Sequence, residues 1–111
     1  MSRLITLSPK TLSQTLAAAP GGLVLLFSSE RCGPCRAFKP VVERVVAQSG
    51  GDLTLLLVDA YASTELAAQY SVRSIPTLVC FRDGEQVDQR AGSMPEPKLR
   101  AMLRDVGVLG P

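Results

Sequence analysis

Two short apolar runs constrain the fold of this chain more than any other feature of its sequence. Residues 23–27 and residues 53–58 consist almost wholly of leucine, valine and phenylalanine. Neither run is long enough for a typical helix, and a strand without regular polar residues is one that is covered on both faces. The two runs therefore predict buried strands in a partly parallel sheet with helices on either side.

The remaining pattern predicts an alternating α/β order. Helical spacing of apolar residues is found through Leu12, Leu16 and Ala17, over 34–48, over 63–70 and in a last helix that ends near Asp105. Further strands are expected over 3–7, 76–81 and 86–91. The expected order is β-α-β-α-β-α-β-β-α, a central mixed five-stranded sheet flanked by four helices, in one domain spanning residues 1–111.

Local signals predict where three of the helices begin. Ser8 followed by Pro9 is typical of an N-cap before the first turn, and Ser63 is expected to cap the third helix. Ser93 and Glu96 match a capping box for the last helix.

Composition excludes several classes of function. The chain has 111 residues and a net charge of +2, which gives no electrostatic footprint for nucleic acid or anionic lipid. No apolar run approaches the ~20 residues that span a bilayer. There is no histidine, which excludes Ser-His-Asp and Cys-His hydrolases and every metal site that needs a histidine ligand.

The first residues do not match a secretory signal, because polar residues interrupt the stretch from Leu4 to Leu16. We therefore expect a cytoplasmic protein, and we expect it to be a monomer. Structural disulfides are rare in that reducing compartment, so two neighbouring cysteines indicate catalysis or metal binding.

The chemistry of the chain is concentrated in Cys32-Gly33-Pro34-Cys35, directly after a predicted strand and at the start of a predicted helix. Free backbone N–H groups and the helix dipole at that position favour a Cys32 thiolate. Pro34 fits the first turn, and a spacing of three places both sulfurs on one helix face. Zinc would need a second pair of thiols, and the remaining cysteine, Cys80, is expected to pack in the core.

The chain resembles the thioredoxin family over essentially its whole length, as an atypical thioredoxin or a thioredoxin-like protein with a CGPC active site. Pro76 follows Cys32 by 44 residues, which fits the spacing of that family. The segments that carry the resemblance are Cys32–Cys35, Tyr70–Thr77, Phe81–Gly84 and Gly92. The resemblance implies a thioredoxin fold and a cis peptide bond before Pro76 that faces the cysteines.

The resemblance also implies a function and its residues. The chain is expected to reduce protein disulfides by dithiol exchange, as an electron carrier in redox homeostasis, with no bound cofactor beyond a redox-active Cys32–Cys35 disulfide. Its electrons would come from NADPH through a flavoprotein thioredoxin reductase, and its partners would be disulfide-containing proteins. The expected catalytic residues are Cys32, Gly33, Pro34 and Cys35, and the expected substrate-binding residues are Arg31, Arg73, Ser74, Ile75 and Pro76.

The chain departs from the family pattern around the motif. Leu26 stands where the family has a buried aspartate, and Leu57 replaces a lysine beside it. Arg31 replaces a tryptophan, and Ser28 replaces an aromatic residue. An apolar environment disfavours a Cys35 thiolate, so long-lived mixed disulfides are expected. Arg31 either stabilises the Cys32 thiolate or is an ordinary solvated charge.

Two alternatives to a reductase remain open. A binding module would use the groove near Ile75 and Pro76 to hold a partner, with little need for turnover. A metal site would need the Cys32 and Cys35 thiolates of two chains. Tyr61 and Tyr70 are expected to serve packing rather than binding.

Overall fold

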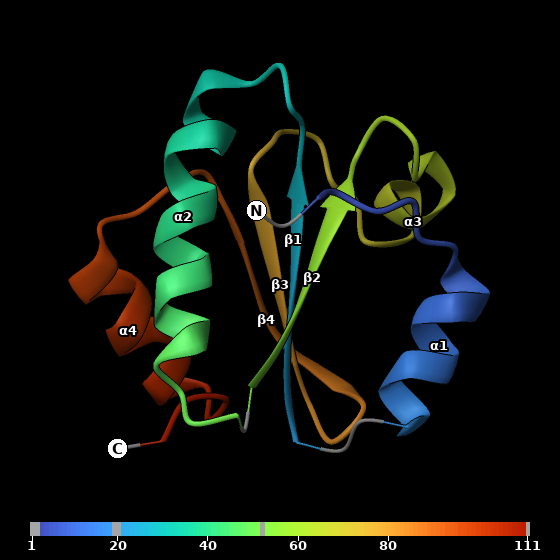
Figure 1. Cartoon of the computed structure of the whole chain (residues 1–111). Coiled ribbons are helices and arrows are strands. Elements are labelled where there is room, and N and C mark those ends of the chain that lie inside the picture. The colour runs from blue at the N-terminus through green and yellow to red at the C-terminus, as the bar shows by residue number, and fades with distance from the viewer. Residues whose placement is uncertain (1–2, 19–20, 52, 111) are drawn as a thin grey trace.

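Four strands form one mixed sheet at the centre of the computed structural model, which describes residues 3–18, 21–51 and 53–110 (Figure 1). The sheet order is β2-β1-β3-β4, with β1 parallel to β2 and antiparallel to β3, and β3 antiparallel to β4. The strands are β1 (Gly22–Ser28), β2 (Leu53–Asp59), β3 (Thr77–Arg82) and β4 (Glu85–Ala91). The helices are α1 (Pro9–Ala18), α2 (Gly33–Ala47), α3 (Thr64–Gln69) and α4 (Glu96–Asp105).

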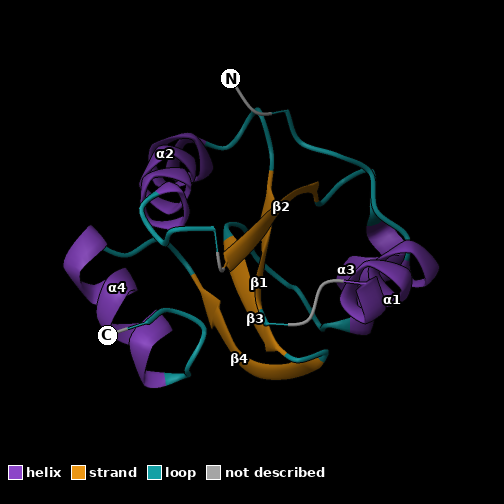
Figure 2. Ribbon diagram, turned by 60° about the horizontal axis from the view of Figure 1, so that its bottom comes forward, coloured by secondary structure: helices purple, strands orange, loops and turns teal. Residues whose placement is uncertain are grey.

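Helices cover both faces of the sheet, as the apolar runs predict. α2 and α4 lie on one face, and α1 and α3 lie on the other (Figures 1 and 2). Val24 and Leu26 of β1 belong to the core beneath α2 and α4, whereas Leu25 and Phe27 belong to the core beneath α1 and α3. All four side chains are fully buried. The α/β class and the two-sided burial of β1 are therefore confirmed.

The prediction of a fifth strand over residues 3–7 is wrong in this structure. Ile5 forms a single parallel bridge with Val58, in which Ile5 N–H donates to the Leu57 carbonyl and Asp59 N–H donates to Ile5, both at 2.8 Å. The N–H of Leu7 donates instead to Ser63 Oγ at 3.0 Å. The chain thus leaves the sheet edge after one bridge and turns into α1.

The predicted caps have different outcomes. Ser8 Oγ accepts from Thr11 N–H at 3.1 Å, which confirms a cap for α1. Ser63 occupies the N-cap position of α3, but its hydroxyl bonds Leu7 rather than its own helix. The capping box is wrong, because Pro95 is the N-cap of α4. The Glu96 carboxylate instead bonds Arg44 at 2.7 Å and Arg100 at 3.2 Å, so it links α4 to α2.

This link gives an expected pH dependence. Hydrogen bonds from Arg44, and then from Arg100, lower the pKa of Glu96 from its ordinary value of 4.5. A lowered folded-state pKa means that the stabilisation is present above the unfolded-state pKa and is lost as pH falls through the folded-state value. The difference in urea midpoint between the wild type and Glu96→Gln should therefore be largest near neutral pH and should shrink below about pH 4.

The matched control for this measurement is Glu85→Gln. Glu85 lies exposed at the start of β4 and has no ion pair within the described part of the chain. A midpoint difference for Glu96→Gln that stayed constant from pH 7 to pH 3 would contradict the prediction.

Candidate redox site

The two cysteines of the motif lie where β1 gives way to α2. Cys32 is the N-cap residue of α2, with extended backbone angles of φ −103° and ψ 118°, and the helix begins at Gly33. The backbone N–H of Cys35 donates to Cys32 Sγ at 3.3 Å. This contact is the one that the helix-terminus argument predicts, because an N–H aimed at sulfur stabilises the negative charge of a thiolate.

Cys32 and Cys35 form a disulfide, with their Cα atoms 5.2 Å apart. The two residues differ in exposure, since Cys32 is partly exposed and Cys35 is fully buried. Gly33 and Pro34 are exposed between them. Of the two cysteines, Cys32 is therefore the one that a second molecule can reach from solvent.

The segment before β3 lies against the exposed cysteine. The Ile75–Pro76 bond is cis, as the resemblance implies. The Ile75 carbonyl oxygen is 3.9 Å from Cys32 Sγ, so residues 43 positions apart meet at the sulfur. The segment is fixed at both ends, because Gly92 N–H donates to the Pro76 carbonyl at 2.8 Å and Thr77 Oγ1 donates to the Ser74 carbonyl at 2.7 Å.

The predicted substrate-binding residues surround this contact. Ile75 is partly exposed and Pro76 is buried, whereas Arg73 and Ser74 are exposed beside them. Arg31, directly before Cys32, is also exposed, and its backbone N–H donates to Ser29 Oγ at 3.2 Å. Within the described ranges its guanidinium makes no ion pair or hydrogen bond.

The side of the site that faces the core is apolar. Leu26 and Leu57 are paired in the register of β1 and β2 and are 0% and 6% exposed. Both pack in the same core cluster as Phe38, which lies one turn after Cys35 on the buried face of α2. The buried polar side chains of the described residues are all hydroxyls: Ser28, Ser29, Ser63 and Thr77. None of these buried side chains is a carboxylate, and Asp59, which ends β2 two residues after Leu57, is only partly buried.

Cys80 is the third cysteine, and it is fully buried in β3. The pKa of its thiol is raised to about 12, mainly by burial and to a lesser extent by the Asp88 carboxylate, against a smaller lowering by Arg90. Such a thiol is neutral at physiological pH and does not act as a nucleophile. The expectation that Cys80 packs in the core is confirmed.

The two tyrosines have different environments. Tyr70 is partly buried and meets Phe81 edge-on, with ring centroids 5.7 Å apart and an interplanar angle of 86°. Its expected packing role is confirmed. Tyr61 is 75% exposed, so a packing role for it is wrong. Tyr61 follows β2, and Cys32 follows β1. Because β1 and β2 are parallel and end in register, both residues lie beyond the same end of the sheet.

No metal-binding group of three or more histidine, cysteine, aspartate or glutamate side chains occurs among residues 3–18, 21–51 and 53–110. None of the helices in those ranges is both long enough and apolar enough to span a bilayer.

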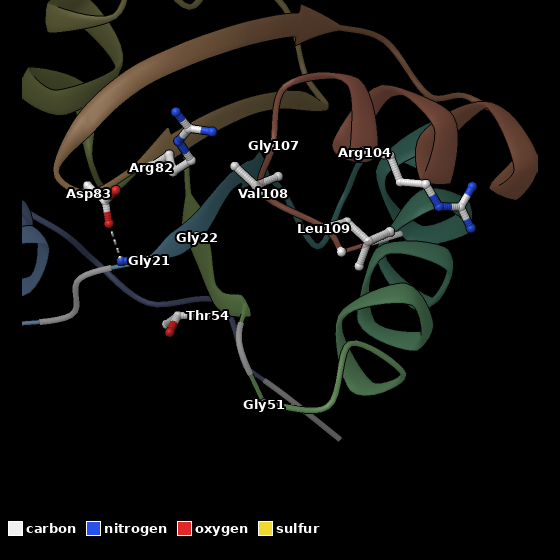
Figure 3. Close-up of a pocket in the computed structure, with 11 residues that line it drawn as sticks. Gly21, Gly22, Gly51, Thr54, Arg82, Asp83, Arg104, Gly107, Val108 and Leu109 are labelled. Carbon is white, nitrogen blue, oxygen red and sulfur yellow. Dashed lines mark hydrogen bonds between the residues drawn. The ribbon is translucent and has the colours of Figure 1, made fainter.

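A hollow of about 860 Å³ lies at the other end of the sheet, where β1 and β2 begin, and Figure 3 shows the residues that line it. It is lined by Gly21, Gly22, Gly51, Thr54, Arg82, Asp83, Arg104, Gly107, Val108, Leu109 and Gly110. Asp83 Oδ1 accepts from Gly21 N–H at 3.0 Å, and the Arg82 and Arg104 side chains point in different directions (Figure 3). The lining contains no thiol, so this hollow has no part in chemistry at Cys32.

Comparisons with known proteins agree with the geometry. The family model described as Thioredoxin matches residues 3–105. A thioredoxin of Chlamydia trachomatis is 47% identical over 83 residues, covering 74% of this chain and 80% of that protein. Thioredoxin 1 of a Nostoc species is 32% identical over 103 residues, covering 93% and 96%.

Solved structures match over nearly the full length. The structure of Fasciola hepatica thioredoxin has a TM-score of 0.82 and 31% identity, covering 93% of this chain and 98% of that one. A mutant thioredoxin from Halobacterium salinarum has the same TM-score and identity, with coverages of 97% and 93%.

Proposed function

The chain belongs to the thioredoxin family, and on that premise we propose that it is a thiol–disulfide oxidoreductase that reduces protein disulfides through Cys32 and Cys35. The observation that carries the proposal is the unequal pair of sulfurs. Cys32 is partly exposed at the start of α2 with a backbone N–H aimed at its sulfur, and Cys35 is buried within bonding distance behind it.

The proposed reaction starts from the reduced pair. The Cys32 thiolate attacks one sulfur of a substrate disulfide, forming a mixed disulfide, and the other substrate sulfur leaves as a thiolate. The Cys35 thiol loses its proton and attacks Cys32 Sγ, which releases the second substrate sulfur as a thiolate. The substrate gains two electrons, and the pair ends as the Cys32–Cys35 disulfide.

The disulfide must then be reduced for a second turnover. We assign this step to a flavoprotein thioredoxin reductase that takes electrons from NADPH. No cofactor bound to the chain is needed, because the electrons reside on the two sulfurs. A reducing cytoplasm and a monomeric state are the setting that suits this role.

The test is a coupled assay with thioredoxin reductase, NADPH and a disulfide-bonded protein substrate. We expect NADPH oxidation that depends on both the chain and the substrate. If dithiothreitol reduces the Cys32–Cys35 disulfide but the coupled assay shows no turnover, the assigned reductase is wrong. If the reduced chain also fails to reduce the protein substrate in a single turnover, the proposed function itself is wrong.

The binding-module alternative is favoured by one observation, the exposed Tyr61 side chain beside the Ile75 segment. The two functions are separated by the double variant Cys32→Ser, Cys35→Ser, which keeps the groove and loses both sulfurs. A cellular activity that survives in this double variant would favour the binding module.

A further inference from the structure

Tyr61 is exposed in a way that the fold does not require. Among the described residues it is the most exposed large hydrophobic side chain, at 75%, compared with 41% for Ile5 and 38% for Val87. Its backbone is nevertheless held in place, because Asp59 Oδ1 accepts from Tyr61 N–H at 3.0 Å and from Ala62 N–H at 3.2 Å. The loop after β2 thus presents an aromatic ring from a fixed position, which is the condition for a binding residue.

Tyr61 borders two hollows that share no other residue. The smaller, of about 160 Å³, is lined by Ala60, Tyr61, Ala67, Val72, Arg73, Ser74 and Ile75. The larger, of about 460 Å³, is lined by Ser29, Glu30, Arg31, Asp59 and Tyr61.

Each hollow includes a residue that neighbours Cys32, in space or along the chain. The smaller hollow includes Ile75, whose carbonyl oxygen is 3.9 Å from Cys32 Sγ. The larger includes Arg31, the residue bonded to Cys32. A protein substrate with its own sulfur at Cys32 therefore has residues on either side of that sulfur within reach of Tyr61. The smaller hollow belongs to the groove already described, and the larger one is unassigned.

The lining of the larger hollow has a defined chemistry. Tyr61 offers a ring, and Arg31 offers a planar guanidinium that has no ion-pair partner within the described part of the chain. A guanidinium is attracted to the face of an aromatic ring, and two rings attract each other in offset or edge-on geometry. The Asp59 and Glu30 carboxylates at the same hollow accept hydrogen bonds from an indole N–H or a phenol O–H.

Charge disfavours other occupants. The hollow holds charges of both signs, so an acidic side chain of the substrate would be repelled by the two carboxylates and a basic one by Arg31, and neither finds a uniformly attractive lining. An aliphatic side chain would gain neither the ring contact with the guanidinium nor a hydrogen bond to a carboxylate. We propose that Tyr61 and Arg31 form a subsite for an aromatic side chain, tryptophan above all, that lies next to the disulfide of a protein substrate. This proposal rests on the proposed function and extends it to substrate choice.

The test compares two peptides that carry the same disulfide and differ only in tryptophan or alanine close to the attacked cysteine. Pre-reduced protein is mixed with each peptide, and the single-turnover rate is followed without any reductase. We expect the wild type to reduce the tryptophan peptide roughly tenfold faster than the alanine peptide, as one favourable aromatic contact allows. The ratio should fall to near one in Tyr61→Ala and should be kept in Tyr61→Phe.

Two further variants make the readout specific. Arg31→Gln should lower the ratio by about threefold, because the cation that faces the ring is lost. Val87→Ala removes an exposed hydrophobic side chain on β4 and should change neither the ratio nor the rates. Because the ratio is taken within each variant, a general change in reactivity cancels.

The outcomes separate the two proposals. Reduction of both peptides at equal rates by the wild type would overturn the subsite and leave the reductase function intact. A ratio that survives Tyr61→Ala, or a peptide with arginine at the same position that reacts faster than the tryptophan peptide, would also overturn it. Failure to reduce either peptide would overturn both proposals.

Discussion

Replacing Cys32 with serine is expected to abolish disulfide reduction. A serine hydroxyl is not ionised at neutral pH, so the backbone N–H of Cys35 would face a neutral oxygen instead of a thiolate. We expect the rate in the coupled assay to fall by a factor on the order of 10³ or more, to the level without the chain. A rate of NADPH oxidation above that level in the coupled assay with Cys32→Ser would contradict the assignment of Cys32 as the nucleophile.

The other two cysteines provide the matched comparisons. Cys35→Ser retains the nucleophile and loses the resolving thiol, so it should accumulate a mixed disulfide with the substrate. Mass spectrometry should detect it as an increase by the mass of one substrate molecule. Cys80→Ala should retain activity, because the Cys80 thiol is buried in β3 and its pKa of about 12 keeps it neutral. Loss of activity in Cys80→Ala, with the fold intact, would mean that the chemistry is not confined to the motif.

The sheet and the motif could be predicted from sequence because each depends on local pattern. An apolar run such as 23–27 can be buried on both faces only inside a covered sheet, and β1 is buried in this way. The position of Cys32 follows from a strand that ends before it and a proline that fits the first turn after it. In both cases the residues that determine the structure lie within a few positions of one another in the sequence.

The features that could not be predicted from the sequence depend on residues that lie far apart along the chain. Residues 3–7 alternate like a strand, but the Leu7 N–H finds the Ser63 hydroxyl and the pairing ends after one bridge. Glu96 stands at the sequence position of a capping-box residue, but Arg44 Nε of α2 lies 2.7 Å from Glu96 Oε1 and pairs with the carboxylate instead. The exposure of Tyr61 depends on the turn that Asp59 fixes. Propensity alone cannot rank such competing partners.

Leu26→Asp is expected to destabilise the fold strongly while accelerating one chemical step. Leu26 is fully buried in β1, and its register partner Leu57 can neither pair with nor hydrogen-bond a carboxylate. A buried charge without a partner costs about 3–5 kcal/mol of folding free energy. Denaturant unfolding at pH 7 should show a loss of this order, and an unchanged or higher stability would contradict it.

The pH dependence of that loss identifies its cause. Burial raises the pKa of the introduced aspartate above the unfolded value of ~3.9, so the cost of the charge is greatest above the folded-state pKa and shrinks as pH falls toward 4. Leu26→Asn is the matched control, because it has nearly the same shape and no titrating group. Its loss of stability should come from cavity and polarity alone and should not vary over the same pH range.

The same variant tests how Cys35 loses its proton. Leu26 belongs to the same core cluster as Phe38, which lies on the buried face of α2 one turn beyond Cys35, and the buried polar side chains of the described residues are all hydroxyls. A carboxylate introduced there places a base among apolar side chains beneath Cys35, so Leu26→Asp should release substrate from the mixed disulfide faster than the wild type. A gain of about tenfold or more corresponds to general-base assistance at the low end of its usual range. If Leu26→Asp and Leu26→Asn release substrate at the same rate as the wild type, then proton removal from Cys35 does not limit this step, and the apolar lining serves stability alone.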